Sequence, residues 1–168
     1  MAMRIFFFVF ATFSLLIPGI AHADLATAND AYAQGNFQMA FQEFQALAEK
    51  GDGFAQNRLG MLYRDGKGTE QNHETATAWF QKAAEGGAIS AYGNLGQAYE
   101  EGIGVAQDYV LAFKWYYLGQ SLTKNAIALR RLKSKMSPLQ TSEAKQLARD
   151  LLRTRRPSFK GLLPALRL

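Results

Sequence analysis

The 168-residue chain contains no cysteine and only four prolines. The absence of cysteine excludes disulfide bonds, thiol nucleophiles and thiolate metal sites. Few prolines leave room for long uninterrupted helices. A hydrophobic content of 48% and a charged content of 20% are ordinary for a folded globular chain. The composition therefore predicts a folded, mainly helical protein.

Residue combinations that carry out chemistry are also scarce. Beyond the first 23 residues His73 is the only histidine, and one imidazole without a second histidine or a cysteine is a poor metal site. We interpret His73 as a solvated helix residue. Glu100 and Glu101 are neighbours, and neighbouring helical positions point about 100° apart, so we interpret them as a solvated helix end. The sequence therefore predicts a protein that is not an enzyme and that binds no metal or cofactor.

The one long apolar run stands near the N-terminus. Arg4 precedes an apolar stretch over residues 5–17, and Ala21-His22-Ala23 follows as a possible cleavage site. This pattern is typical of a secretory signal peptide. An uncleaved membrane anchor is the alternative, although the run is shorter than the roughly 20 residues of a membrane span. We expect cleavage after Ala23, no integral span in the mature chain, and a periplasmic or secreted bacterial protein.

Charge is distributed unevenly along the chain. Residues 24–112 hold 12 acidic and 5 basic side chains, a net charge of −7, whereas residues 113–168 hold 2 acidic and 13 basic ones, a net charge of +11. Such asymmetry indicates a basic surface that meets an anionic partner, or a feature that serves export and solubility alone.

The middle of the chain repeats itself. The stretch "LGQAYEEGIG" at 95–104 follows "LGMLYRDGKG" at 59–68 with a shift of 36 residues, and the second half of the unit, 76–87, also resembles 40–51. A fixed period between 20 and 50 residues is the signature of stacked repeats. The sequence therefore predicts an array rather than a single globular core.

Each unit has the pattern of two helices. Ala55, Leu59 and Tyr63 are spaced by four and share one helix face. A glycine beside them, Gly60, costs about 1 kcal/mol in helix propensity, which predicts that another helix approaches closely there. Neither helix of a pair could bury such a face alone, so the pairs are expected to stack.

Turn and capping residues set the expected boundaries. Gly66 and Gly102 suit the left-handed conformation that ends a helix, and Asn72 and Asp108 suit the start of the next helix. The expected helices cover 25–34, 37–50, 53–65, 72–86, 88–101, 108–122 and 124–135, with a last helix from Pro138.

The last helix carries its own start signal. Ser137 and Gln140 form a capping box around Pro138. Its expected apolar stripe is Leu139, Ala144, Leu147, Leu151 and Leu152.

Four aromatic residues could be read as a base-stacking platform for nucleic acid. They fall on the repeated apolar stripe, so we predict that they pack in the core and that the protein binds no nucleic acid. They are Tyr63, Trp79, Tyr99 and Trp115.

These motifs support a family resemblance. Leu-Gly-x-x-Tyr followed by Ala-x-x-x-aromatic resembles the tetratricopeptide repeat, and the longer Gly-x-Gly loop makes the unit similar to the Sel-one-like repeat (SLR) family of exported bacterial proteins. The resemblance implies an all-α fold, a right-handed alpha-alpha superhelix of helical hairpins. Some relatives resemble penicillin-hydrolysing proteins with a cysteine pair in each repeat, and this chain has no cysteine.

The resemblance and the repeat divide the chain into six parts. They are a signal peptide (1–23), an entry half-repeat (24–52), two repeats (53–87 and 88–122), C-terminal capping helices (123–152) and a basic flexible tail (153–168).

Function is expected to lie on a surface. We predict a non-catalytic scaffold that binds a protein or peptide on the concave face of the array. The predicted contact residues, all expected to be exposed on that face, are Asn57, Arg58, Met61, Arg64, Asn94, Gln97 and Glu101.

An alternative hypothesis places function in the basic C-terminal region. Its cations would bind an anionic cell-envelope polymer or surface. The candidate residues are Arg130, Arg131, Lys133, Arg153, Arg155, Arg156 and Lys160.

Overall fold

A computed structural model describes residues 24–155. Within that range the chain forms eight α-helices and no strand, which confirms the predicted all-α class. The predicted signal peptide and the residues from 156 onward, including Arg156 and Lys160, lie outside the described part. The helices are α1 (Leu25–Ala33), α2 (Phe37–Glu49), α3 (Gly53–Asp65), α4 (His73–Glu85), α5 (Ile89–Glu101), α6 (Tyr109–Leu118), α7 (Thr123–Lys133) and α8 (Pro138–Arg155).

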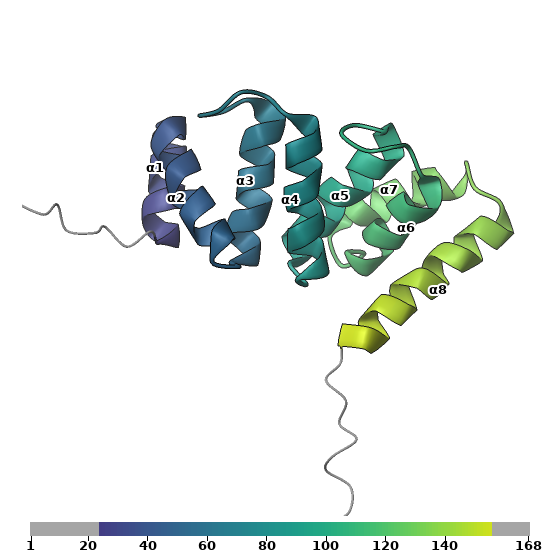
Figure 1. Ribbon diagram of the computed structural model, residues 1–168. Coiled ribbons are helices and arrows are strands. Elements are labelled where there is room, and N and C mark those ends of the chain that lie inside the picture. Colours follow the sequence, from purple (N-terminus) through teal and green to yellow (C-terminus); the bar gives the residue numbers. More distant parts are fainter. Residues whose placement is uncertain (1–23, 156–168) are drawn as a thin grey trace, which may run out of the picture.

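The helices pack as consecutive antiparallel hairpins (Figure 1). From α1 to α7 each helix contacts the next along the chain, and α3 also contacts α5. This second kind of contact joins the first helices of neighbouring pairs, which is how stacked repeats meet. The final helix, α8, lies across the end of the array and packs on α6.

The core is a series of clusters that cross the boundaries between pairs. Phe44 of α2 and Leu59 of α3 are fully buried in the first cluster, which joins α1, α2 and α3. Trp115 is 4% exposed and packs with residues of α4 and α5. The other three predicted core aromatics are partly buried against these clusters, as expected: Tyr63, Trp79 and Tyr99.

Side chains and glycines end the helices as the sequence predicts. Asn72 Oδ1 accepts a hydrogen bond from Thr75 N at 2.8 Å, and Asp108 Oδ1 accepts two at the start of α6. Gly66 and Gly102 end α3 and α5 in the left-handed conformation. The first four backbone amides and the last four carbonyls of a helix have no partner within that helix. Capping residues supply some of these partners, so they fix where each hairpin turns.

The start of α8 also confirms its predicted capping box. Ser137 Oγ accepts from Gln140 N at 3.2 Å, and Gln140 Oε1 accepts from Ser137 N at 2.9 Å. The predicted apolar stripe is wrong for three of its five residues, since Leu139, Leu147 and Leu152 are 79%, 38% and 48% exposed. Small side chains face α6 instead, since Ala144 and Ala148 are fully buried and let the two helices approach closely.

Gly60 and Gly96 lie where the two helices of a repeat touch. A Cβ atom on Gly60 would lie 2.6 Å from Phe80 Cε1, and one on Gly96 would lie 2.8 Å from the ring of Tyr116. Both distances are far below van der Waals contact. The prediction of a close helix approach at Gly60 is therefore confirmed, and it holds in both repeats.

Candidate functional site

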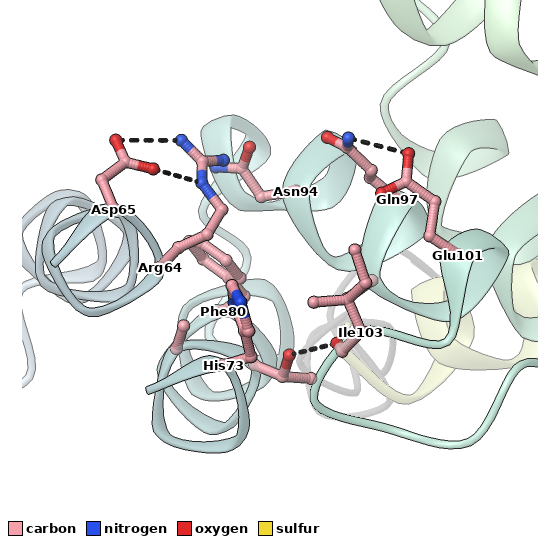
Figure 2. Close-up of a pocket in the computed structure, with 11 residues that line it drawn as sticks. Arg64, Asp65, His73, Phe80, Asn94, Gln97, Glu101 and Ile103 are labelled. Atoms are coloured by element: carbon pink, nitrogen blue, oxygen red, sulfur yellow. Dashed lines mark hydrogen bonds and ion pairs between the residues drawn. The ribbon is translucent and has the colours of Figure 1, made fainter. Parts of the chain in front are cut away.

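A cavity of about 260 Å³ opens between the first helices of the two repeats. One wall is the end of α3, the opposite wall is α5, and the start of α4 lies between them (Figure 2). The lining residues are Arg64, Asp65, His73, Ala76, Thr77, Phe80, Asn94, Gln97, Ala98, Glu101 and Ile103.

Helical spacing places the polar side chains of α5 along this cavity. Asn94, Gln97 and Glu101 are three and four residues apart, so they share one helix face. Gln97 Nε2 donates to Glu101 Oε1 at 2.9 Å. Across the cavity, Arg64 Nε donates to Asp65 Oδ1 at 2.8 Å. Both walls therefore present polar groups that are already held in position.

The remaining lining is largely apolar. Ala76 and Phe80 come from α4, and Ala98 and Ile103 come from α5 and the loop after it. Thr77 Oγ1 donates to the carbonyl of Ile103 at 3.1 Å, which ties this loop to α4. A cleft with an apolar base and a few fixed polar groups is the usual form of a binding pocket.

A second cavity of about 230 Å³ lies on the other side of α5, toward α7. Asn94, Gln97 and Glu101 line both cavities. The polar face of α5 is therefore a ridge between two hollows. We call this surface, from Arg64 on α3 to Arg131 on α7, the inter-repeat groove.

Four of the seven predicted contact residues line the first cavity: Arg64, Asn94, Gln97 and Glu101. Arg58 points elsewhere, since its guanidinium lies 5.0 Å from the ring centre of Phe54 and 5.6 Å from that of Tyr32. Met61 is partly buried against the core cluster of α4 and α5. Whether any of the seven binds a partner stays a prediction.

The expectation that Asn57 is exposed is wrong. It is only 5% exposed, and its Oδ1 accepts a hydrogen bond from Asn94 Nδ2 at 2.8 Å. The contact between α3 and α5 covers it. Asn57 therefore holds Asn94 in position and offers little surface to a ligand.

The interpretation of Glu100 as part of a solvated helix end is wrong. Its side chain is 5% exposed. Arg131 Nη2 lies 2.7 Å from Oε2 and Arg131 Nε lies 3.1 Å from Oε1, so the pair is bidentate. Tyr116 Oη donates to Oε2 at 3.0 Å, and Lys135 Nζ lies 3.8 Å from Oε1. Glu101 is exposed, as expected.

This buried carboxylate changes the titration of its neighbours. Burial and the negative charge of Glu100 raise the pKa of Tyr116, so its hydroxyl keeps its proton and remains a donor. The hydrogen bonds and charge of Glu100 also raise the pKa of Arg131. The cluster is a structural link between the second repeat and α7.

His73 differs from its interpretation as a solvated residue. It is partly buried and lines the first cavity, and its Nδ1 is buried without a hydrogen-bond partner among residues 24–155. Its position at the first turn of α4 gave no hint of this. Asp65 was also missed, although the 36-residue shift aligns it with Glu101.

The cations of the alternative hypothesis are dispersed. Arg130, Lys133 and Arg153 are exposed, and Arg155 ends α8. Arg131 is 56% exposed but paired with Glu100. Within the described residues, no group of three His, Cys, Asp or Glu side chains could hold a metal ion, and none of the helices is long and apolar enough to cross a membrane.

The geometry defines a helical-repeat protein with a surface groove. The model of the Sel1 repeat family matches residues 53–87 and 89–119. The chain is also similar to c5321, a protective antigen present in uropathogenic Escherichia coli strains that displays an SLR fold (TM-score 0.66, 29% identity). A Sel1 repeat protein from Oxalobacter formigenes is similar too (TM-score 0.63, 28% identity).

The two structural matches differ in how much of each solved protein this chain spans. Both structural matches cover 76% of this chain, which spans 29% of the Escherichia coli protein and 56% of the Oxalobacter protein. Comparison with curated protein sequences gave no match. The chain therefore contains two Sel1 repeats, as its sequence motifs predicted, and is similar in structure to bacterial SLR proteins. Such proteins commonly mediate protein interactions and are generally non-catalytic.

Proposed function

We propose that this protein is a non-catalytic scaffold that binds an extended peptide or protein segment in the inter-repeat groove. The observation that carries the proposal is the cavity between α3, α4 and α5, whose mouth is lined by Arg64, Asn94, Gln97 and Glu101. The apolar base offers burial to a side chain, and the polar ridge offers hydrogen bonds to a backbone.

Prior positioning of these groups supports binding. Asn94 is fixed by Asn57, and Gln97 is fixed by Glu101. A ligand then loses less free energy in ordering the side chains that it contacts. The second hollow, toward α7, extends the surface enough for a segment longer than one side chain.

A matched pair of substitutions tests the groove. Peptides are selected from a random display library on the immobilised full chain, and their affinities are measured by fluorescence anisotropy. Gln97→Arg is expected to weaken binding about tenfold or more, because it fills the mouths of both cavities. Gln81→Arg is the control, since Gln81 is exposed on α4 and makes the same bond to a glutamate four residues later, at 2.9 Å.

Two outcomes would contradict the proposal. One is a selection that yields no peptide. The other is a set of peptides whose affinity falls equally in the Gln97→Arg and Gln81→Arg proteins. Thermal unfolding of both variants separates loss of binding from loss of fold.

We also propose that the protein is exported and cleaved after Ala23, because the N-terminal sequence has the order of a secretory signal peptide. When the full chain is expressed in a bacterial host, the mature protein is expected in the periplasmic or culture fraction with Asp24 as its first residue. Intact-mass measurement and N-terminal sequencing check this. A chain that retains Met1 in the cytosolic fraction contradicts it.

A further inference from the structure

The end of the first cavity nearest the inter-helix loops is negatively charged. Asp65 and Glu101 occupy the last positions of α3 and α5, where the helix dipoles add partial negative charge. Arg64 is the only Lys or Arg among the lining residues, and it is already paired with Asp65. Among residues 24–155, Glu101 accepts a hydrogen bond only from a neutral amide. This end of the cavity therefore favours a cation.

The interior suits a long cationic side chain. Phe80, Ala98 and Ile103 offer an apolar wall, against which the methylene stem of a lysine or arginine can lie while its charged head reaches polar groups. His73 also lines the cavity, and its buried Nδ1, which has no partner among residues 24–155, accepts a hydrogen bond in the tautomer that carries its proton on Nε2. The cavity thus combines a carboxylate, an imidazole and an apolar wall.

The chain itself contains a segment of matching chemistry. Residues 156–168, "RPSFKGLLPALRL", hold three cations, no acidic residue and several leucines. Residues 24–112, which include most of the lining of the cavity, carry the opposite net charge, −7. Charge complementarity therefore exists within one molecule.

The segment follows a helix that packs on the same core cluster as the cavity, and its length allows it to reach the cavity. It follows Arg155, the end of α8, and Leu151 in the last turns of α8 packs against the core cluster that contains Ala76 and Phe80. These two residues also line the cavity. Thirteen residues can extend about 45 Å, whereas a helix with its side chains is about 10–12 Å across. The segment is long enough to pass around one helix pair.

We propose that residues 156–168 fold back within the same molecule and place a basic side chain in the cavity between α3, α4 and α5. The segment would then compete with an external partner for the inter-repeat groove, so the inference gives that proposed binding site a built-in regulator. Because the segment is tethered, its effective concentration is in the millimolar range, enough for a weak contact to occupy the site.

Paramagnetic relaxation tests this contact in the full chain. The absence of cysteine allows one nitroxide label at Ala165→Cys without other changes. Broadening is expected for the backbone amides of residues 97–104 and is expected to persist on dilution. Glu101→Lys should abolish it by reversing the charge that holds the segment. Glu85→Lys should not, because Glu85 is exposed on α4 and bonded to Gln81 in the same way.

Three results would overturn the inference. They are the absence of broadening at 97–104, equal broadening in the Glu101→Lys and Glu85→Lys proteins, and broadening that appears only between labelled and unlabelled molecules. The last result would mean that the segment binds a second copy.

A second measurement separates this inference from the proposed function. In the full chain with Arg156→Glu and Lys160→Glu, a library-selected peptide is expected to bind about tenfold more tightly. If peptides bind the groove but this variant changes nothing, the competing segment is refuted while the binding site stands. If no peptide binds either protein, the proposed function itself fails.

Discussion

Gly104→Ala is expected to destabilise the protein by about 2–5 kcal/mol, a large share of the stability of a chain this size. Gly104 has a φ of +70°, where a side chain is strained. Its added Cβ would collide with the carbonyl group of His73 and lie 2.8 Å from Thr77 Oγ1. The loop would have to lift away from α4, with loss of the Thr77–Ile103 hydrogen bond. Urea denaturation followed by circular dichroism measures the change.

Gly86→Ala is the matched control for this prediction. Gly86 follows α4 with a φ of −70°, and its added Cβ would come no closer than 3.3 Å to another group. Alanine at such a position is expected to change the stability by less than about 1 kcal/mol, and can raise it by restricting the unfolded chain. Similar losses at both positions would show that the Gly104 loop is not packed tightly on α4.

Local signals made most of the fold predictable from the sequence. Helix caps depend on hydrogen bonds between residues within four positions of each other, so they can be predicted without knowing how the helices pack. This holds for Asn72 and Asp108, for the left-handed glycines and for the Ser137–Gln140 capping box. The repeat supplied the rest, because a face that recurs every 36 residues must be buried by its own copies. The one large error in helix length concerns α6, which was expected to reach residue 122 but ends just before Gly119. The side chain of the buried Asn125 donates a hydrogen bond to the carbonyl of Gly119.

Side-chain environments were predictable only where they depend on one helix. Spacing alone places Asn94, Gln97 and Glu101 on one face of α5. It cannot say that α5 covers Asn57, because that depends on how the first helices of the two repeats pack against each other. The α4 wall of the cavity was missed for the same reason. His73 and Phe80 reach the cavity only through the packing of α4 against its neighbours.

Glu100 shows the limit most clearly. The 36-residue shift aligns it with Arg64, a residue of opposite charge, so the repeat gives no signal for a buried carboxylate. Its main partner, Arg131, lies on α7, outside the repeated units. The sequence contains both charges but nothing that pairs them.

Glu100→Ala is expected to lower the free energy of unfolding by about 2–4 kcal/mol, although the adjacent Glu101→Ala should change it by less than about 0.5 kcal/mol. Removing the carboxylate leaves the hydroxyl of Tyr116 without its acceptor in a side chain that is 4% exposed. It also removes the bidentate contact that holds α7 against the second repeat. Glu101 is exposed and, within the described part of the chain, bonds only to Gln97, so its loss leaves no buried group there unsatisfied.

A double-mutant cycle with Arg131→Ala assigns the loss to this contact. Arg131 is 56% exposed, so water can solvate it when Glu100 is gone, and Arg131→Ala should cost little in the Glu100→Ala background. In the native background the same change leaves a buried carboxylate with Tyr116 and the more distant Lys135, and its cost should be clearly larger. Equal costs in both backgrounds would mean that Glu100 and Arg131 act independently. Hydrogen exchange of the α7 amides, expected to speed up in both single variants, locates the effect at the junction that closes the array.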